Sequence, residues 1–403
     1  MVWIFIWDTA PSKIFVWWSE VASVRAGDTK VRPTIQPFWD TITITWTETS
    51  NPAQFNPIWS DWADWAVAWD TRFDEWFWYS WVRLNNSWVE TAEITQAGSW
   101  WFWNLDITQL WTLTSWDNVM IKFPVRWIKM TKSWSSVTLS MTKTLNKSWY
   151  QYYAFNKNWT RKNNLYLWAY NWTNSWGYLK SRSWTSAITR FSIDSAVSAA
   201  NAYWWGIYHE ETFYAREYIN AMYMMKYGNP NSQSVIWQWY VRWSAAQTTW
   251  WTDWIITATW ATNTSWTWRI KLFWLEDRWG NVNEWLDWAR WDGSYSIQTS
   301  SSQAFSSSSR ITSFDRSVSV PYLSYAWCIS SIVWSNDGMF IWTGTSWSTS
   351  TYYCDIWAPP TSDIYFCAWW FYNGQLNSWI FSMLTNSSYS SNAMYWCRLM
   401  CLW

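Results

Sequence analysis

The sequence predicts an α+β protein, with a β-rich N-terminal region followed by a loop-rich α+β domain. Thr, Ile and Val alternate with other residues in DTITITWTETSNP (40–52), and similar short runs recur in 89–100 and 105–118, separated by turn residues. This period of two is typical of half-buried strands. Apolar residues at helical spacing in 188–203 and 210–228 indicate two helices further along the chain.

The length of the chain and a change in its residue pattern predict three regions. A chain of 403 residues exceeds one ordinary domain. Residues 1–35 hold two short β-runs around a glycine turn, and residues 36–117 are expected to form a β-sandwich-like domain. Residues 118–403, where the two helices fall, are expected to form the loop-rich α+β domain.

The expected helices carry end signals. Ser192 or Asp194 is placed to cap the first helix, and Gly228 to end the second. Met222, Met224 and Met225 cluster on the second helix, where methionines are expected to fill the core rather than bind a ligand.

Charge and cysteine content exclude several classes of function. Lys and Arg balance Asp and Glu at a formal net charge of +0, which gives no basis for nucleic-acid binding. No apolar run approaches the roughly 20 residues of a membrane span, so membrane insertion is not expected. The N-terminus lacks the basic region of a secretory signal. The five cysteines match no zinc spacing and are expected to be buried thiols.

The anomaly of the composition is 53 tryptophans against 10 glycines. At average usage, a chain of this length would hold about 28 glycines. Tryptophan stands in turn-like contexts where glycine is usual because it reaches positive φ without a Cβ clash. These contexts surround Trp88, Trp134, Trp149, Trp159, Trp176, Trp184, Trp266 and Trp347.

We therefore hypothesise that most of the tryptophans are glycines in the cell. Some bacterial lineages and their phages read the UGA codon as glycine, whereas another common code reads it as tryptophan. Residues 59–81 would then be a polar, glycine-rich loop, although as printed they resemble an aromatic interaction patch. UGG codons at the suspect positions would refute the hypothesis and leave a protein that is truly rich in tryptophan.

One motif carries a resemblance to a known family. With Trp274 and Trp288 read as glycine, residues 273–288 become FGLEDRWGNVNEWLDG, and Trp279 and Trp285 stand as genuine core tryptophans. This segment resembles the central signature of the C-type-lectin-like domain in relatives of the formylglycine-generating enzyme, also called sulfatase-modifying-factor-like proteins. Asn281, Glu284 and Asp287 are candidate Ca²⁺ ligands by this resemblance, with a hydrogen-bonded polar core as the alternative.

Within that family, the span 118–403 resembles variable proteins of diversity-generating retroelements, which occur in phage tails and on bacterial surfaces. Residues 13–33 also resemble small repeats of phage tail proteins. The resemblance implies that a reverse transcriptase rewrites adenines in the codons of a variable region at about 320–403. It also implies that one exposed face displays the products, and that WCRLM (396–400) belongs to a fixed final strand.

Adenine replacement in an asparagine codon yields many residues but not Trp, Met or Gln, so Gln375, Met383 and Met394 fit the scheme poorly. The residue types that it allows, Tyr, Phe, Asn and Asp above all, suit recognition loops. The candidate ligand-binding residues are Ile356, Ala358, Pro359, Asp363, Tyr365, Ala368, Phe371, Tyr372, Asn373, Leu376, Asn377, Thr385, Tyr389 and Asn392. The alternative is that they are ordinary loop residues.

The expected function is non-enzymatic binding to a surface protein or glycan of a host or neighbouring cell, from a phage tail (virion) or a cell surface. A homotrimer would fit a tail protein. No cofactor is expected apart from the Ca²⁺ that the motif admits. His209, the single histidine, is expected to support the start of a helix rather than catalysis. Two alternatives stay open: a formylglycine-generating-type oxidase that uses cysteine chemistry, and a structural tail component.

Overall fold

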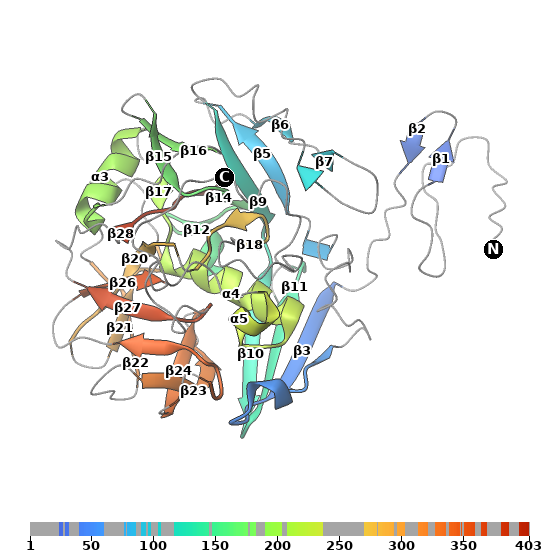
Figure 1. Cartoon of the computed structure of the whole chain (residues 1–403), viewed down its shortest axis with the longest axis vertical. Coiled ribbons are helices and arrows are strands. Elements are labelled where there is room, and N and C mark those ends of the chain that lie inside the picture. Colours follow the sequence, from blue (N-terminus) through green and yellow to red (C-terminus); the bar gives the residue numbers. More distant parts are fainter. Residues whose placement is uncertain are drawn as a thin grey trace, which may run out of the picture.

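In the computed structural model, the described part of the chain is built mainly of antiparallel strands around one long buried helix (Figure 1). The described residues are 24–26, 29–31, 40–59, 76–77, 79–85, 90–93, 96–97, 104–105, 117–144, 147–175, 178–182, 190–203, 208–236, 270–279, 281–293, 296–302, 313–320, 327–335, 338–346, 348, 350–358, 364–368, 380–386 and 395–402. Strands dominate these ranges, and the class is a β-rich α+β.

Three larger sheets make up the body of the described structure. The first has the order β10 (Trp127–Ser133), β11 (Ser136–Thr142), β3 (Thr41–Thr47), β4 (Ile58–Trp59). The second has the order β17 (His209–Glu210), β29 (Leu399–Leu402), β14 (Asn164–Trp168), β9 (Asn118–Pro124), β5 (Ser80–Leu84), β6 (Glu90–Glu93).

The third and largest sheet carries the C-terminal region. Its order is β22 (Arg316–Ser319), β21 (Ser296–Thr299), β20 (Asn283–Trp291), β26 (Ile364–Ala368), β27 (Met383–Asn386), β25 (Ile356–Ala358), β23 (Trp327–Trp334), β24 (Phe340–Ser346), and β28 (Tyr395–Trp396) pairs with β20. Two-stranded hairpins complete the described strands: β1 (Val24–Ala26) with β2 (Thr29–Val31), β7 (Gln96–Ala97) with β8 (Asn104–Leu105), β12 (Asn156–Lys157) with β13 (Thr160–Arg161), β15 (Trp172–Ser175) with β16 (Tyr178–Ser181), and β18 (Lys271–Leu272) with β19 (Leu275–Glu276).

Two of these sheets contain strands from both sides of residue 117, where the sequence analysis placed a domain boundary. β3 pairs with β11 along its whole length, with Thr41 opposite Thr142 and Thr47 opposite Ser136. β5 pairs with β9 in the same way. A division at residue 117 would therefore cut through both sheets, because their hydrogen-bonded ladders cross it.

The helices form where the sequence predicts them. α3 (Ile193–Tyr203) starts after Ser192, whose hydroxyl accepts a hydrogen bond from the Ser195 amide at 3.2 Å. α4 (Phe213–Tyr227) ends at Gly228 in the left-handed conformation, at φ 59°. A short α5 (Ser232–Val235) follows, and η1 (Pro52–Gln54) and η2 (Tyr153–Phe155) are single 3₁₀ turns.

α4 is the central element of the fold. Every one of its residues is buried, including the three methionines predicted to fill the core. Its contacts reach all three large sheets: the Trp59 indole donates to the Met225 carbonyl at 2.8 Å, the Tyr218 hydroxyl lies 3.4 Å from the Pro124 carbonyl, and Phe213 packs on Phe366. A helix buried on all sides is one around which the sheets are assembled.

Three two-residue hairpin turns place tryptophan where glycine is usual. Trp134 is the first turn residue between the paired Ser133 and Ser136, with φ 54°. In the turns Asn158–Trp159 and Phe273–Trp274 both residues have positive φ, with φ 62° and 65° at the tryptophans. Asn-Gly is the most favoured sequence for such a turn. Glycine would adopt these backbone conformations without strain.

Two sets of the described tryptophans differ clearly in backbone and exposure. Trp134, Trp149 and Trp159 combine positive φ with side chains that are 94%, 74% and 69% exposed. Trp279 and Trp285, predicted to be genuine, are fully buried and are not among the residues with positive φ.

Two findings limit the glycine hypothesis. Trp76 and Trp81 lie in the hydrophobic core, and Trp59 packs against it without a positive φ, so these three tryptophans do not belong to a polar, glycine-rich loop. Trp288 combines φ 73° with complete burial, unlike the three exposed tryptophans with positive φ. The other suspect tryptophans, Trp88, Trp176, Trp184, Trp266 and Trp347, lie outside the described residues.

We predict that Trp134→Gly, Trp149→Gly and Trp159→Gly each stabilise the protein. A left-handed conformation costs a residue with a Cβ roughly 1–2 kcal/mol, and an exposed indole contributes little packing in return. Urea unfolding should therefore give a gain of about 1 kcal/mol for each variant. Trp279→Gly, a buried control, should instead lose about 3–5 kcal/mol. Destabilisation by all three turn variants would refute the assignment.

Candidate functional site

Five of the candidate ligand-binding residues lie on strands β25, β26 and β27 of the largest sheet. Ile356 and Ala358 lie on β25, Thr385 lies on β27, and Tyr365 and Ala368 lie on β26. β27 lies between the other two strands and is parallel to β25 and antiparallel to β26. The remaining candidates, Pro359, Asp363, Phe371, Tyr372, Asn373, Leu376, Asn377, Tyr389 and Asn392, lie outside the described residues.

Two of the candidates are not on an exposed face. Tyr365 and Ala368 are 7% and 1% exposed. Tyr365 packs in the cluster around Trp285, and Ala368 packs in the main core. The expectation that they contact a ligand is corrected here, because their strand is covered by core on both faces.

A rigid frame holds the described ends of the candidate region. Ala368, the last residue of β26, pairs with Met383, the first residue of β27. The buried carboxylate of Asp355, just before β25, accepts hydrogen bonds from the Phe381 amide at 3.2 Å and the Ser382 hydroxyl at 3.0 Å. The chain that leaves β26 at residue 369 therefore returns to a fixed point on the neighbouring strand.

Glu48 fastens the N-terminal strands to this frame. Its carboxylate accepts from the Tyr353 hydroxyl at 2.6 Å and from the Ile332 amide at 2.9 Å, and it pairs with Lys132 of β10. Tyr353 directly precedes the segment that leads into β25. Glu48, which follows β3 in the sequence, thus holds the chain just before the first candidate ligand-binding residue, Ile356.

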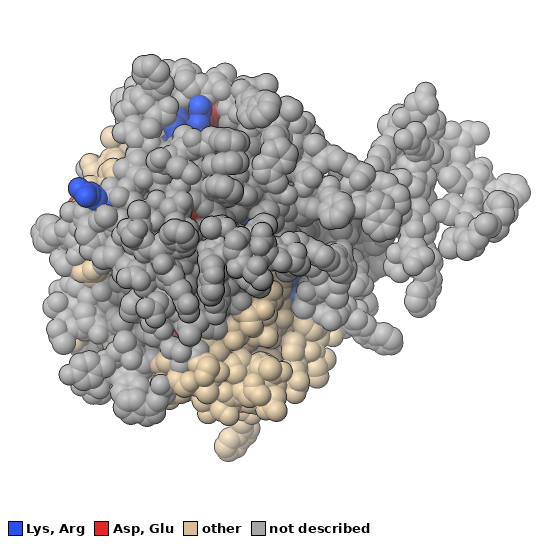
Figure 2. Space-filling view, viewed as in Figure 1, with Lys and Arg blue, Asp and Glu red and all other residues tan. Residues whose placement is uncertain are grey.

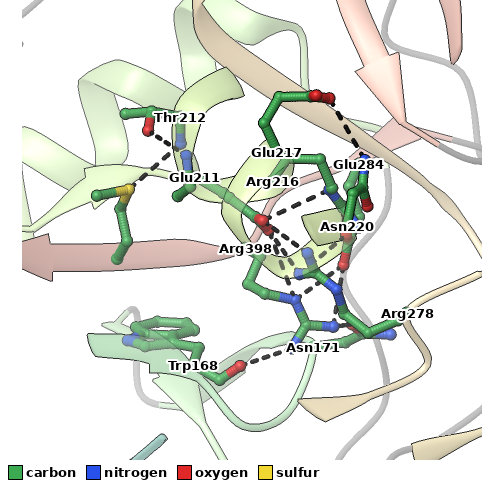
Figure 3. A network of polar contacts seen from close by, with 12 residues as sticks. Trp168, Asn171, Glu211, Thr212, Arg216, Glu217, Asn220, Arg278, Glu284 and Arg398 are labelled. Atoms are coloured by element: carbon green, nitrogen blue, oxygen red, sulfur yellow. Dashed lines mark hydrogen bonds and ion pairs between the residues drawn. The ribbon is translucent and has the colours of Figure 1, made fainter. Parts of the chain in front are cut away.

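A buried ionic network lies beside the N-terminal end of α4 (Figure 3). Arg278 donates to both oxygens of Glu211 at 2.8 Å. Arg216 of α4 pairs with Glu284 of β20. Two carboxylates and three guanidinium groups, the third being Arg398, share this site out of contact with water.

Arg398 connects the network to the end of the chain. Its guanidinium donates to Glu284 at 3.0 Å, to the Trp168 carbonyl at 2.6 Å and to Asn171 at 2.7 Å. It also donates to the Glu276 carbonyl at 2.7 Å, within the motif that carried the family resemblance. The WCRLM segment is therefore joined to the GNVNEW segment through charge-assisted hydrogen bonds.

The network keeps Glu211 ionised. Burial raises the pKa of Glu211, but Arg216 and Arg278 outweigh that effect and bring its pKa to about 2. The sequence analysis named Glu284 but missed Glu211 and the three arginines. The arginine of WCRLM was the available signal, since a charge amid buried strand residues requires a partner.

The candidate Ca²⁺ ligands make polar contacts within the protein. Asn281 donates to Asp277 at 2.9 Å, and Glu284 faces the guanidinium groups of Arg216 and Arg398. Asp287 accepts from the amide of Trp288 at 2.7 Å. Over the described ranges, no group of three or more His, Cys, Asp or Glu is placed to hold a metal ion. The geometry fits the alternative, a hydrogen-bonded polar core.

His209 lies in this core on β17, directly before the turn into α4. Its Nδ1 is 2.9 Å from the Glu210 carbonyl oxygen and 3.2 Å from the Trp288 indole nitrogen, and its Nε2 is 3.5 Å from Asp287. Burial lowers the pKa of His209 to about 4, so the ring is neutral at pH 7. Thr212, three residues after His209, caps α4 through its hydroxyl.

All five cysteines are buried and unbridged, as the sequence predicts. Burial raises the pKa of Cys367 and Cys397 well above the usual value, with a further contribution from Glu210. Burial also raises the pKa of Cys328 to about 11. A thiol that stays protonated is a weak nucleophile and a poor metal ligand.

Comparison with known proteins adds no relative: no protein-family model matches the chain, and no curated protein matches it significantly.

We predict that breaking the ionic network at one residue unfolds the protein more readily. Arg398→Met removes one charge and leaves Glu284 short of a partner, so about 3–5 kcal/mol of stability should be lost in urea unfolding. The matched control is Lys122→Met, which breaks the part-exposed pair with Glu90 at 2.7 Å. That control should cost no more than about 1 kcal/mol, and equal losses would contradict a special role for the network.

A second prediction concerns Glu217 of α4. Its carboxylate accepts from the Phe340 amide at 2.8 Å, and burial raises its pKa from 4.5 to about 8. Between these values the folded state binds more protons than the unfolded state, so this group makes the free energy of unfolding fall as the pH rises.

Glu217→Gln removes the titrating group and keeps an oxygen that accepts from the Phe340 amide. Urea titrations at several pH values should give the variant a flatter stability profile than the parent between about pH 4.5 and 8. Parallel profiles for the two proteins would show that Glu217 does not titrate as described.

Proposed function

We propose that the chain is a non-enzymatic ligand-binding protein that displays a diversified face on a C-type-lectin-like scaffold. The face is formed by the candidate residues that remain after Tyr365 and Ala368 are set aside, with Phe371, Tyr372 and Asn373 at its centre. Its partner is a surface protein or glycan of a host or neighbouring cell. The protein acts from a phage tail or a cell surface.

The observation that carries the proposal is the frame around residues 369–379. Both described ends of this stretch are fixed, by the pairing of Ala368 with Met383 and by the hydrogen bonds of Asp355. A scaffold that tolerates many sequences in one segment must hold that segment from outside it, because the segment's own side chains change. The frame uses backbone pairing and a buried carboxylate that do not depend on the candidate residues.

The ionic network supports the same proposal. It joins residues upstream of the candidate region, Glu211 and Arg278, to Arg398 downstream of it. The buried, protonated thiols also favour binding over cysteine-based oxidation, since oxidation needs an accessible thiolate. Tyr, Phe and Asn, the types that the region is rich in, give large contact area and adaptable hydrogen bonds.

The test compares binding of matched variants to intact cells. Fluorescently labelled protein is incubated with bacterial strains from the community in which the gene occurs, and bound fluorescence is measured by flow cytometry. Simultaneous substitution of Phe371, Tyr372 and Asn373 by serine should abolish binding to any strain that the parent binds, with the melting temperature unchanged. Ser317→Ala is the control, because Ser317 is an exposed residue on β22, the first strand in the order of the largest sheet.

Retained binding by the triple variant would overturn the assignment of the face. The genome provides an independent test of diversification. A neighbouring reverse-transcriptase gene with an adenine-rich template repeat would support it. Identical C-terminal codons in all sister genomes would instead favour a structural tail component.

A further inference from the structure

A second surface feature lies away from the candidate face, where the loop after β3 meets the C-terminal end of α4. A groove of about 490 Å³ is lined there by Pro52, Phe55, Asn56, Pro57, Trp59 and Tyr227, among others. Its size falls in the range of small-molecule sites, roughly 300–1,000 Å³. None of its lining residues is charged.

The walls of the groove are rigid. The Trp59 indole is fixed by its hydrogen bond to the Met225 carbonyl at 2.8 Å. Pro57 lies so close to Gly228 that a Cβ there would come within 2.4 Å of the proline ring. Asn51 caps η1 by accepting from the Ala53 amide at 3.1 Å. A preformed groove of this kind can bind a ligand at little cost in ordering.

Two amide side chains stand at the groove beside the aromatic rings. Asn56 is exposed and held at φ 44°. Asn229 accepts from the Asn231 amide through its Oδ1 at 2.9 Å, which directs its Nδ2 group to donate elsewhere. Neutral amides that flank an aromatic ring match the hydroxyl groups and the C–H face of a sugar.

The accessible rings favour a sugar over a proline-rich peptide. Such a peptide docks on a row of open aromatic side chains. Here Phe55 and Tyr227 are buried, and Trp59 is the one lining aromatic that is partly exposed. The single accessible indole of Trp59 can stack against a single sugar ring.

The surroundings are uncharged as well. Figure 2 shows a continuous patch of uncharged residues over the lower part of the molecule, where α5 and β3 lie in Figure 1. Ile58, next to the groove, is 70% exposed. An anionic or cationic ligand would find no partner of opposite charge among the lining residues.

From these observations we propose that the groove between residues 52–59 and the end of α4 binds a neutral sugar ring of a glycan. This site is constant, because it lies outside the candidate variable region, and it is independent of the proposed face. The sugar ring stacks on Trp59, and its hydroxyl groups hydrogen-bond to Asn56 and Asn229.

The test uses the full-length protein with methyl β-glucoside, methyl β-galactoside, N-acetylglucosamine and their disaccharides as probes. Saturation-transfer NMR should detect at least one of these, and calorimetry should give its affinity. Trp59→Ala should weaken that affinity by about tenfold, the loss expected when an aromatic anchor is truncated. Asn56→Gly, which suits the positive φ, should weaken it severalfold without loss of stability.

Trp134→Ala is the matched control, since it removes a more exposed indole that lies outside the groove. It should leave the affinity unchanged. Absence of saturation transfer from every neutral saccharide would overturn the proposal, as would unchanged affinity in both groove variants. Binding of a decaproline peptide in place of the sugars would reassign the groove to peptide. The serine variant of the proposed face should bind the sugar normally, which separates the two proposals.

Discussion

The rest of the structure depends on the pairing of three buried arginines with two buried glutamates beside the start of α4. The five groups come from α4, from the motif around β20, from the turn before α4 and from the segment before β29. Charges removed from water are costly unless they are paired with good geometry. A conformation that separates these elements would leave a buried charge behind, so the network specifies one arrangement where apolar packing alone would tolerate sliding.

Around this point, buried polar groups hold together elements that are distant in sequence. α4 has no exposed residue, and the strands that contact it are fixed by buried polar groups such as Glu217 and Asp355. The anchors come from residues distant in sequence, for example Glu48 against Ile332 and Tyr353. A surface segment held by such remote anchors can change its side chains without loss of the frame.

The sequence predicts the local features well and the long-range ones poorly. Helix ends at Ser192 and Gly228 and the buried methionines of α4 follow from spacing and turn chemistry within a few residues. The buried positions of Trp279 and Trp285 were expected from the resemblance of their motif. The pairing of β3 with β11 and the placing of β29 between β17 and β14 depend on contacts across tens or hundreds of residues. Burial of Tyr365 and Ala368 was missed for the same reason, since both faces of β26 are covered by distant elements. The arginine partners of Glu284 carry no spacing signal at all.

The position of β29 has a consequence for how variants of this protein are made. This strand lies inside a sheet, between β17 and β14, and all four of its residues are buried. It is also encoded downstream of the candidate ligand-binding residues, the last of which is Asn392. An insertion or deletion of one nucleotide upstream would replace both β29 and Arg398 and leave the sheet with a gap in its middle. Under the proposed diversification, folding would act as a reading-frame check on each rewritten copy, because only in-frame copies would keep β29 and Arg398.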